Sequence, residues 1–211
     1  MPTLRGHCAE TPEALLGVHW KEWVVDGEKA LDNLSMEVEK VIVIGHSMGG
    51  WIALHLAIDH KDKIDSIVIA AASTRSVSPL GPHRPLHFLA PLIVRLQKRR
   101  NTPPVYADPS LAKNYTGYGW KPTIVYLKVF ALMKATEKRL PEVSIPILVM
   151  HSKNDSANSP KGAEMLFNRI STPQDQKRFV WFEKTEHDMF VDCEREATIR
   201  TVVDYVKERI A

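Results

Sequence analysis

The chain has 211 residues, of which 44% are hydrophobic and 25% charged, a size and composition typical of one globular domain with a substantial core. Its 28 Lys and Arg residues against 25 Asp and Glu leave a formal net charge of only +3, too small an excess to indicate a nucleic-acid partner. No run of about 18 apolar residues is present, so no integral membrane segment is predicted. The first residues also lack an apolar signal-peptide core, and we therefore expect a cytoplasmic protein.

The first third of the chain predicts a helix, a strand, a helix and a strand. In residues 20–34 apolar positions recur at spacings of three and four, as in an amphipathic helix. Residues 41–44 form a continuous β-branched run, which is typical of a strand buried on both faces of a parallel sheet. A helix that is apolar nearly all round is predicted at 51–58, and a second buried strand within 64–72.

Residues 73–141 have a different character, because nine prolines break this segment into short pieces. We interpret it as a lid inserted over the sheet, with helices near 86–99 and 124–140 that carry apolar faces. The basic cluster at Lys98, Arg99 and Arg100 is then the solvated end of the first of these helices. The predicted organisation is a core made of 1–72 and 142–211, with a lid or cap at 73–141.

The last third repeats the alternation. Strands are predicted at 145–150 and 179–182, and helices at 160–170 and 194–210. Strands that alternate with helices in this way indicate an α/β fold with a doubly wound parallel sheet. Four good parallel strands are predicted in total.

A G-x-S-x-G motif stands between the strand at 41–44 and the helix that follows it. A serine on such a sharp turn projects its hydroxyl above the sheet, and the glycines at 45 and 49 let the neighbouring backbone come close. Ser47 is therefore the candidate nucleophile. The backbone N–H of Met48 begins the helix and can donate to an oxyanion. His46 flanks the serine and is expected to pack against the site or line the substrate pocket.

A serine hydroxyl needs a base, and the base needs an acid, so two more side chains must reach the same edge of the sheet. Polar loops at the ends of the last two strands supply the candidates, Asp155 as the acid and His187 as the base. The order Ser, Asp, His along the chain is the order of α/β-hydrolases. The alternative interpretation is that the motif forms a structural turn in which the serine has no catalytic role.

Other histidines and acidic residues are given supporting roles. His151 is expected to support the acid, while His55 and His60 are expected in core or surface positions on the helix after the turn. Asp188 and Asp192 are expected to hold the loop of the base or to cap the last helix at Glu194.

The two cysteines show no CxxC or metal-binding spacing, and both are expected to be reduced thiols. Cys193 in particular is interpreted as a small buried thiol.

The elements and motifs described above, taken together, resemble the small α/β-hydrolases related to bacterial carboxylesterases and monoacylglycerol lipases. Residues 4–7 are similar to that family's G-H-G turn, 20–26 to its W-x-x-W/D helix and 45–50 to its G-x-S-M-G-G elbow. Asp155 falls at the family's acid position, and residues 186–192 resemble its S-H-x-x-x-x-D segment. The resemblance covers nearly the whole chain. It implies that Ser47 is acylated by a small-molecule ester with an apolar acyl chain and freed by water, with no metal and no cofactor.

The chain departs from that family in two places. Cys8 stands where the turn has its second glycine, and the strand and H-G-F or H-G-G segment that supply the second oxyanion donor are missing. We therefore expect an N-terminally reduced sheet in which residues 41–44 form an unpaired edge, through which a homodimer is possible. Three alternatives to a carboxylesterase or lipase stay open: a thioesterase, another acyl hydrolase such as a perhydrolase or amidase, and a non-catalytic remnant.

Overall fold

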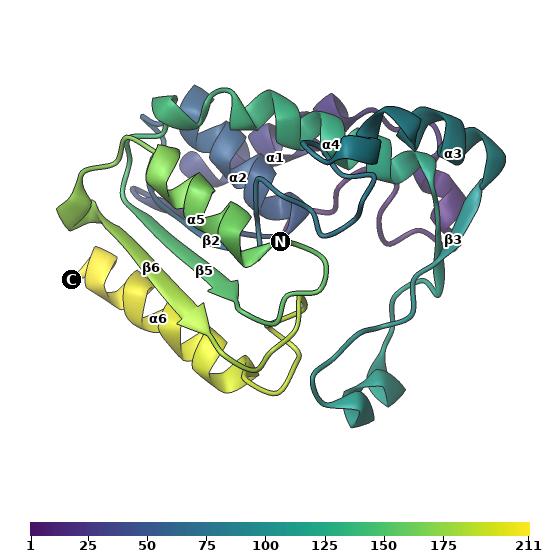
Figure 1. Cartoon of the computed structure of the whole chain (residues 1–211). Helices are drawn as coiled ribbons and strands as arrows, with labels where there is room; N and C mark the ends of the chain where they lie inside the picture. The colour runs from purple at the N-terminus through teal and green to yellow at the C-terminus, as the bar shows by residue number, and fades with distance from the viewer.

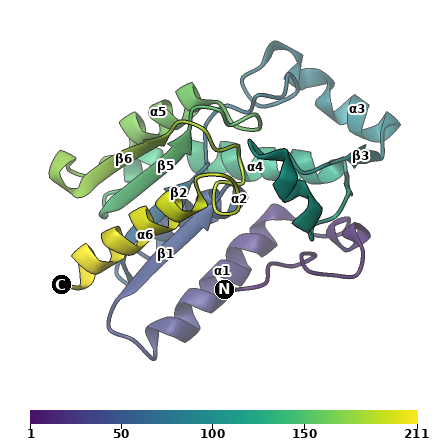
Figure 2. The same ribbon diagram turned by 90° about the horizontal axis from the view of Figure 1, so that it is seen from below.

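A computed structural model describes all of residues 1–211. At its centre lies a four-stranded sheet in the order β1-β2-β5-β6, in which all neighbouring strands are parallel. Figure 1 shows β2, β5 and β6 running side by side, and Figure 2 shows β1 at the far edge beside α1. The predicted α/β fold with a doubly wound, reduced parallel sheet is confirmed. The strands are β1 (Val41–His46), β2 (Ile64–Ala70), β5 (Ile147–Ser152) and β6 (Lys177–Phe182).

Helices cover both faces of this sheet, with α6 alone on one face and α1, α2 and α5 on the other (Figure 1). The buried side chains of each strand alternate between the two layers. On β2, Ile67 and Ile69 join the larger core cluster, and Val68 and Ala70 join the smaller one beneath α6. This alternation explains the continuous apolar runs in the sequence. The helices are α1 (Trp20–Ser35), α2 (Met48–Asp59), α5 (Pro160–Arg169) and α6 (Arg195–Ile210), with short 3-10 turns η1 (Pro12–Leu15) and η5 (Gln174–Gln176).

The segment at 73–141 forms short elements above the carboxyl ends of the strands. Its last helix, α4, packs against α2 and α1, and β3 pairs with β4 in a small antiparallel sheet. The division of the chain into a core and a cap with these boundaries stays a prediction. The elements are η2 (Pro85–Leu89), α3 (Ala90–Leu96), β3 (Arg99–Asn101), η3 (Pro109–Asn114), β4 (Trp120–Pro122), α4 (Ile124–Glu137) and η4 (Leu140–Glu142).

The predicted helix at 86–99 is wrong at its C-terminal end, since α3 ends at Leu96, Lys98 lies in the connection that follows, and Arg99 and Arg100 lie in β3. Strand pairing overrides the helical pattern here: Arg99 lies opposite Pro122, and Arg100 opposite Lys121. The guanidinium of Arg99 also stacks 4.2 Å above the ring of Trp120. The basic cluster is exposed, but it is not the end of a helix.

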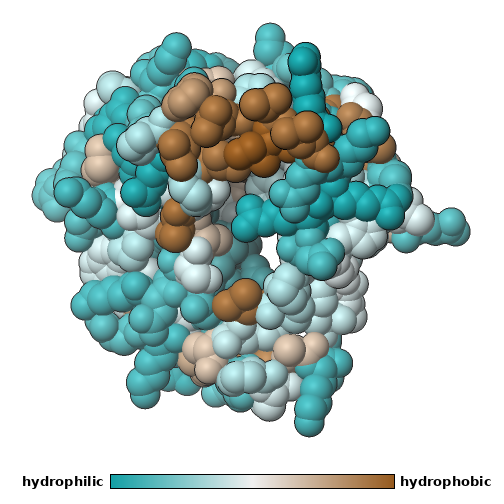
Figure 3. Space-filling model, turned by 45° about the vertical axis from the view of Figure 1, so that its right-hand side comes forward, coloured by the Kyte–Doolittle hydropathy of each residue, from teal (hydrophilic) through white to brown (hydrophobic).

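The apolar face of η2 and α3 is largely exposed, whereas that of α4 is buried. Phe88 is 73% and Leu96 78% exposed, and Leu86 and Leu92 are exposed as well. Figure 3 shows apolar side chains gathered in a band across the top of the molecule, where α3 lies in Figure 1. A surface of this kind is unusual for a helix that only packs on the body of a protein.

The first strand, β1, has one neighbour only and forms an edge of the sheet, as the sequence predicts. Ile44 on this strand is 49% exposed, while Val41 is buried. None of the helices combines the length and the hydropathy needed to cross a membrane.

Candidate active site

Ser47 lies on a tight turn between β1 and α2, with backbone angles of φ 52° and ψ −115° that residues other than glycine rarely adopt. Its N–H donates to the carbonyl of Ala70 on β2 (2.8 Å), and its own carbonyl accepts from the N–H of Gly50 (3.0 Å). Gly45 permits the turn, because a Cβ at that position would lie 2.3 Å from the carbonyl oxygen of Gly49. The turn holds the serine at the carboxyl ends of the strands.

The side chains of Ser47, His187 and Asp155 form a chain of hydrogen bonds above the sheet. The Ser47 Oγ lies 2.8 Å from Nε2 of His187, and Nδ1 of the same ring lies 2.9 Å from Oδ2 of Asp155. Asp155 follows β5, and His187 follows β6, so each comes from the end of its own strand. The structure thus brings together the three side chains that the sequence selects, although they are 32 and 140 positions apart.

Asp155 is buried, with 4% of its surface exposed, and hydrogen bonds from backbone N–H groups stabilise its negative charge. The N–H groups of Ala157 (2.9 Å) and Asn158 (2.8 Å) donate to Oδ1. Burial alone raises the pKa of this carboxyl, but the hydrogen bond and charge of His187 outweigh burial and leave the pKa of Asp155 below its usual value. The group is therefore an ionised acceptor that fixes the imidazole.

The pKa of His187 is raised above its ordinary value. Burial lowers it, but the hydrogen bond to Asp155 and the negative charge of that carboxylate raise it by more. With Nδ1–H donating to Asp155, the lone pair of Nε2 faces the hydroxyl of Ser47. A base in this arrangement is neutral at high pH and is stabilised when it takes up a proton.

His151 lies directly beneath the acid, in agreement with its expected supporting role. It is fully buried, and its Nε2 is 3.2 Å from the carbonyl of Asn158 and 3.4 Å from Oδ2 of Asp155. Burial lowers the pKa of His151, so the ring is neutral beside the carboxylate.

The loop of the base is held by Asp192, as the sequence predicts. This carboxylate is 1% exposed and accepts from the N–H groups of Glu186 (2.6 Å) and Cys193 (2.7 Å). It also accepts from the N–H groups of Ala107 (3.0 Å) and Asp108 (3.3 Å), which belong to the inserted segment. The buried side chain of Asp192 therefore connects the loop of His187, the turn that leads into α6 and the inserted segment.

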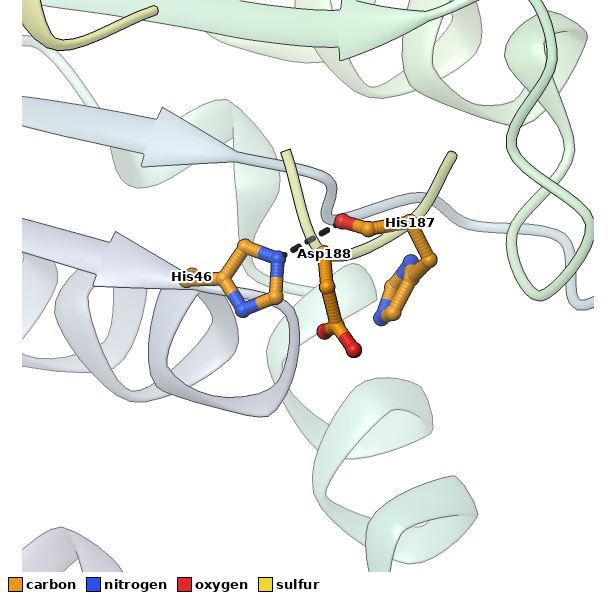
Figure 4. Close-up of side chains that lie close together, drawn as sticks. All are labelled: His46, His187 and Asp188. Carbon is orange, nitrogen blue, oxygen red and sulfur yellow. Dashed lines mark hydrogen bonds between the residues drawn. The ribbon is translucent and has the colours of Figure 1, made fainter. Parts of the chain in front are cut away.

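His46 and Met48 line the wall of the site on either side of Ser47. The Nε2 of His46 is 2.9 Å from the carbonyl oxygen of His187, and the two rings are 5.1 Å apart (Figure 4). Burial lowers the pKa of His46, so its Nε2–H donates to that carbonyl from a neutral ring. Met48 opens α2, and the first N–H groups of a helix have no partner within it.

Two expectations from the sequence, the role of Asp188 and the burial of Cys193, are wrong. Asp188 neither holds the base loop through its carboxylate nor caps α6, whose cap residue is Glu194. Its carboxylate instead faces the cavity beside His46 and His187 (Figure 4). Cys193 is exposed and not buried, because it occupies the turn into α6, where Asp192 takes the inward position. His55 and His60 lie on α2 and after it, half-buried and paired with Asp59 and Glu28, as expected.

A cavity of about 500 Å³ opens beside Ser47 and His187. One wall comes from the core, and the other comes from the inserted segment 102–133. Half of its 24 lining residues are hydrophobic, and the insertion contributes apolar and aromatic ones: Val105, Tyr115, Tyr118, Val125, Tyr126, Val129, Phe130 and Met133. A site of this size and character suits a ligand with an apolar portion.

Two further basic side chains line this cavity, and no pattern in the sequence indicated them. Lys121 of β4 and His7 of the N-terminal turn lie on its wall. Lys121 sits in a segment whose pairing with β3 was not predicted, so no local pattern could have placed it. The turn that holds His7 was noted, but only for its resemblance to a family motif.

The chain matches one protein family over most of its length and is similar in sequence to a known lipase. A protein family described as serine aminopeptidase, S33, matches residues 3–194. A thermostable monoacylglycerol lipase from Bacillus sp. (strain H-257) is 25% identical, over 97% of this chain and 77% of the lipase.

Solved structures with the same fold include one from a study of two metagenome-derived lipolytic enzymes, LipS and LipT. It superimposes with a TM-score of 0.86 at 19% identity, over 98% of this chain and 80% of that chain. The monoacylglycerol lipase of Paleococcus ferrophilus gives a TM-score of 0.69 at 22% identity, over 88% of this chain and 76% of that chain.

Proposed function

The chain belongs to the serine aminopeptidase S33 family of α/β-hydrolases, and on that premise we propose that it is a serine esterase that hydrolyses carboxylic esters with an apolar acyl chain. The observation that carries the proposal is the hydrogen-bonded series from Ser47 through His187 to Asp155, with spacings of 2.8 and 2.9 Å. Nucleophilic catalysis by serine requires this geometry.

In the proposed reaction Ser47 Oγ attacks the ester carbonyl while Nε2 of His187 takes the hydroxyl proton. Asp155 stays ionised and stabilises the imidazolium that forms. The N–H of Met48 donates to the oxyanion, and the imidazolium returns the proton to the leaving alcohol. Water activated by the same base then attacks the acyl-enzyme, which releases the carboxylic acid and restores the serine.

The proposed substrate class is supported by the cavity and by the relatives. The apolar wall that the insertion contributes can hold an acyl chain, and the exposed apolar band on η2 and α3 offers a surface on which lipid-like substrates can approach. Monoacylglycerol lipases are among the similar proteins. We further propose that the protein works in a reducing compartment such as the cytoplasm, because Cys8 and Cys193 are free thiols.

The test is labelling by a fluorophosphonate probe, which reacts with an activated serine, combined with hydrolysis of p-nitrophenyl esters of increasing acyl length. The parent protein should be labelled and should turn over the esters. Ser47→Ala should lose labelling and reduce turnover by about 10³-fold or more. Ser156→Ala is the control, since Ser156 also lines the cavity but has no histidine partner. Thioester and anilide substrates in the same panel separate a thioesterase or an amidase from an esterase.

A non-catalytic role is the second candidate, favoured by the absence of a strand on the outer side of β1. In the family that the sequence resembles, a strand at that position leads to the second oxyanion donor. Loss of one such donor slows turnover by about 10²–10³-fold in enzymes where it has been measured. If the parent protein is neither labelled nor active, the esterase proposal is wrong and the ligand-binding alternative stands.

A further inference from the structure

Two imidazoles and a carboxylate face one another at the cavity wall beside Ser47. His46, His187 and Asp188 each place one potential ligand atom within 4.8 Å of the other two. Figure 4 shows the carboxylate of Asp188 between the two rings. All three residues are half-buried and line the cavity, so an ion can reach them from solvent.

Each of the two rings has one nitrogen with a lone pair that a cation could bind. His46 donates through Nε2–H to the carbonyl of His187 (2.9 Å), which leaves the lone pair on Nδ1. His187 donates through Nδ1–H to Asp155 (2.9 Å), which leaves the lone pair on Nε2, where a cation would replace the hydroxyl of Ser47 (2.8 Å). Metal-binding histidines in proteins are oriented in this way, by donation from the second nitrogen to a carbonyl or carboxylate.

Asp188 supplies a third ligand that no other interaction occupies. Its backbone carbonyl accepts from the N–H of Val191 (3.0 Å), but its carboxylate makes no hydrogen bond or ion pair in the protein. A half-buried carboxylate without a partner beside two imidazole nitrogens is a favourable place for a positive ion.

We propose that His46, His187 and Asp188 form an inhibitory binding site for Zn²⁺. Two imidazoles and one carboxylate are a common zinc ligand set, with water in the fourth position, whereas Mg²⁺ and Ca²⁺ prefer oxygen ligands. Zinc bonds of about 2.0–2.2 Å place neighbouring ligand atoms roughly 3.4 Å apart, so the three side chains must close by roughly an ångström. Rotation of the unpaired Asp188 side chain provides part of this movement, and small rotations of the two imidazole rings, whose centroids are 5.1 Å apart, provide the rest.

A zinc ion on Nε2 of His187 takes the lone pair that must accept the proton of Ser47. The bound ion therefore stops the reaction without blocking the whole cavity. The inhibition rests on the proposed function, but the binding of zinc does not.

The first test is a calorimetric titration of the full chain with Zn²⁺ and, separately, with Mg²⁺. The parent should bind one zinc ion and no magnesium. Asp188→Asn should weaken zinc binding more than tenfold, because loss of an outer partner alone costs about 10–100-fold. Glu28→Gln is the matched control, since it removes a carboxylate that lies 3.3 Å from another histidine, His60, outside the cavity. Its zinc titration should match that of the parent.

The second test follows ester hydrolysis at increasing zinc concentration, with each variant compared with its own zinc-free rate. The parent should be inhibited and should recover on addition of a chelator, and Asp188→Asn should need more than about tenfold more zinc. A parent that binds no zinc, or an Asp188→Asn variant that binds it equally well, refutes the site. A parent that binds zinc through Asp188 but never hydrolyses esters supports the site and refutes the esterase proposal.

Discussion

The backbone of Ser47 is held in a conformation that costs about 1–3 kcal/mol relative to an ordinary one. Two backbone hydrogen bonds and the close approach of Gly45 to Gly49 maintain it. The strain is local, but it directs Oγ to a point 2.8 Å from His187. At the scale of single residues, the site therefore depends on a strained turn and on the charge that Asp155 places behind the base.

That charge predicts the pH dependence of catalysis. Burial lowers the pKa of His187, but the bond to Asp155 and its charge raise it to a net value above the usual 6.5. Only the neutral ring accepts a proton. The value of kcat/KM should therefore be low at pH values below the raised pKa and should rise as the pH increases through it. In Asp155→Asn the raising contribution is gone, so the midpoint should move to lower pH, and the rate at the plateau should fall by about 10³–10⁴-fold. A pH profile of kcat/KM for both proteins measures the two effects.

The matched control for the pH profile is Asp175→Asn, a change in an exposed 3-10 turn far from the base. Its profile should coincide with that of the parent. A midpoint that stays in place in Asp155→Asn would show that this carboxylate does not set the pKa of the base.

Cys8 has a backbone φ of 55°, the left-handed conformation that glycine adopts without strain. The family that the sequence resembles has a glycine at this point of the turn. Cys8→Gly should therefore stabilise the protein by up to about 1 kcal/mol, the cost of that conformation for a residue with a side chain. Urea denaturation of both proteins measures the difference.

Cys193→Gly provides the comparison for this change, because Cys193 is also exposed but does not have a positive φ. There the same substitution only increases the freedom of the unfolded chain, and stability should fall. Equal effects at both positions would contradict the explanation by backbone strain.

At the scale of elements, the site depends on how the loops after β5 and β6 are joined. Asn154 donates to the carbonyls of Glu183 (3.0 Å) and Lys184 (3.2 Å), and Ser156 donates through its N–H to Glu186 (3.0 Å). The acid loop and the base loop thus form one unit. Asp192 then fixes this unit to the inserted segment.

Asp192→Ala should be among the most damaging changes outside the three reacting side chains. It leaves the buried hydroxyl of Thr185 and four part-buried N–H groups without this acceptor, and a buried donor that loses its partner costs about 1–3 kcal/mol. We expect a loss of roughly 3 kcal/mol or more in the free energy of unfolding. Denaturant unfolding gives the stability, and ester hydrolysis by the fraction that remains folded gives kcat, which should also fall as the loop of His187 loosens.

Asp188→Ala tests whether the position of the carboxylate matters in this prediction. Asp188 lies in the same loop, but its carboxylate has no hydrogen bond to lose, so the stability should change by less than about 0.5 kcal/mol. Equal destabilisation by the two substitutions would remove the special role of Asp192.

At the scale of the whole molecule, the central sheet has an open edge at β1. The outer side of β1 has unpaired backbone groups, and the exposed Ile44 lies on that strand. We propose that two copies associate through this edge.

Ile44→Lys should weaken the association, because a charge on an edge strand opposes pairing with another strand. Sedimentation equilibrium should give a dissociation constant at least about tenfold higher for this variant than for the parent, equivalent to about 1.4 kcal/mol. Ile199→Lys on α6 is the control, since Ile199 is 48% exposed against 49% for Ile44. A parent that is monomeric at all concentrations, or two variants that behave alike, would rule out this interface.

Much of the fold and of the candidate site follows from local patterns in the sequence. Strands and helices impose different periods on apolar residues, and these periods placed all four strands of the central sheet and the helices that cover it. The glycine pattern around Ser47 indicated the tight turn, and parallel strands end at one edge of a sheet, which made Asp155 and His187 the residues to expect beside it.

Other features were decided only when distant segments packed together. The pairing of β3 with β4, the exposure of Cys193 and of α3, and the entry of Lys121 into the cavity depend on contacts between segments far apart in the chain. The meeting of Asp188 with His46 is of the same kind. A local pattern fixes which way a side chain points from its own element, but the partner that it meets depends on the register and packing of the whole chain, and these arise only in the folded state.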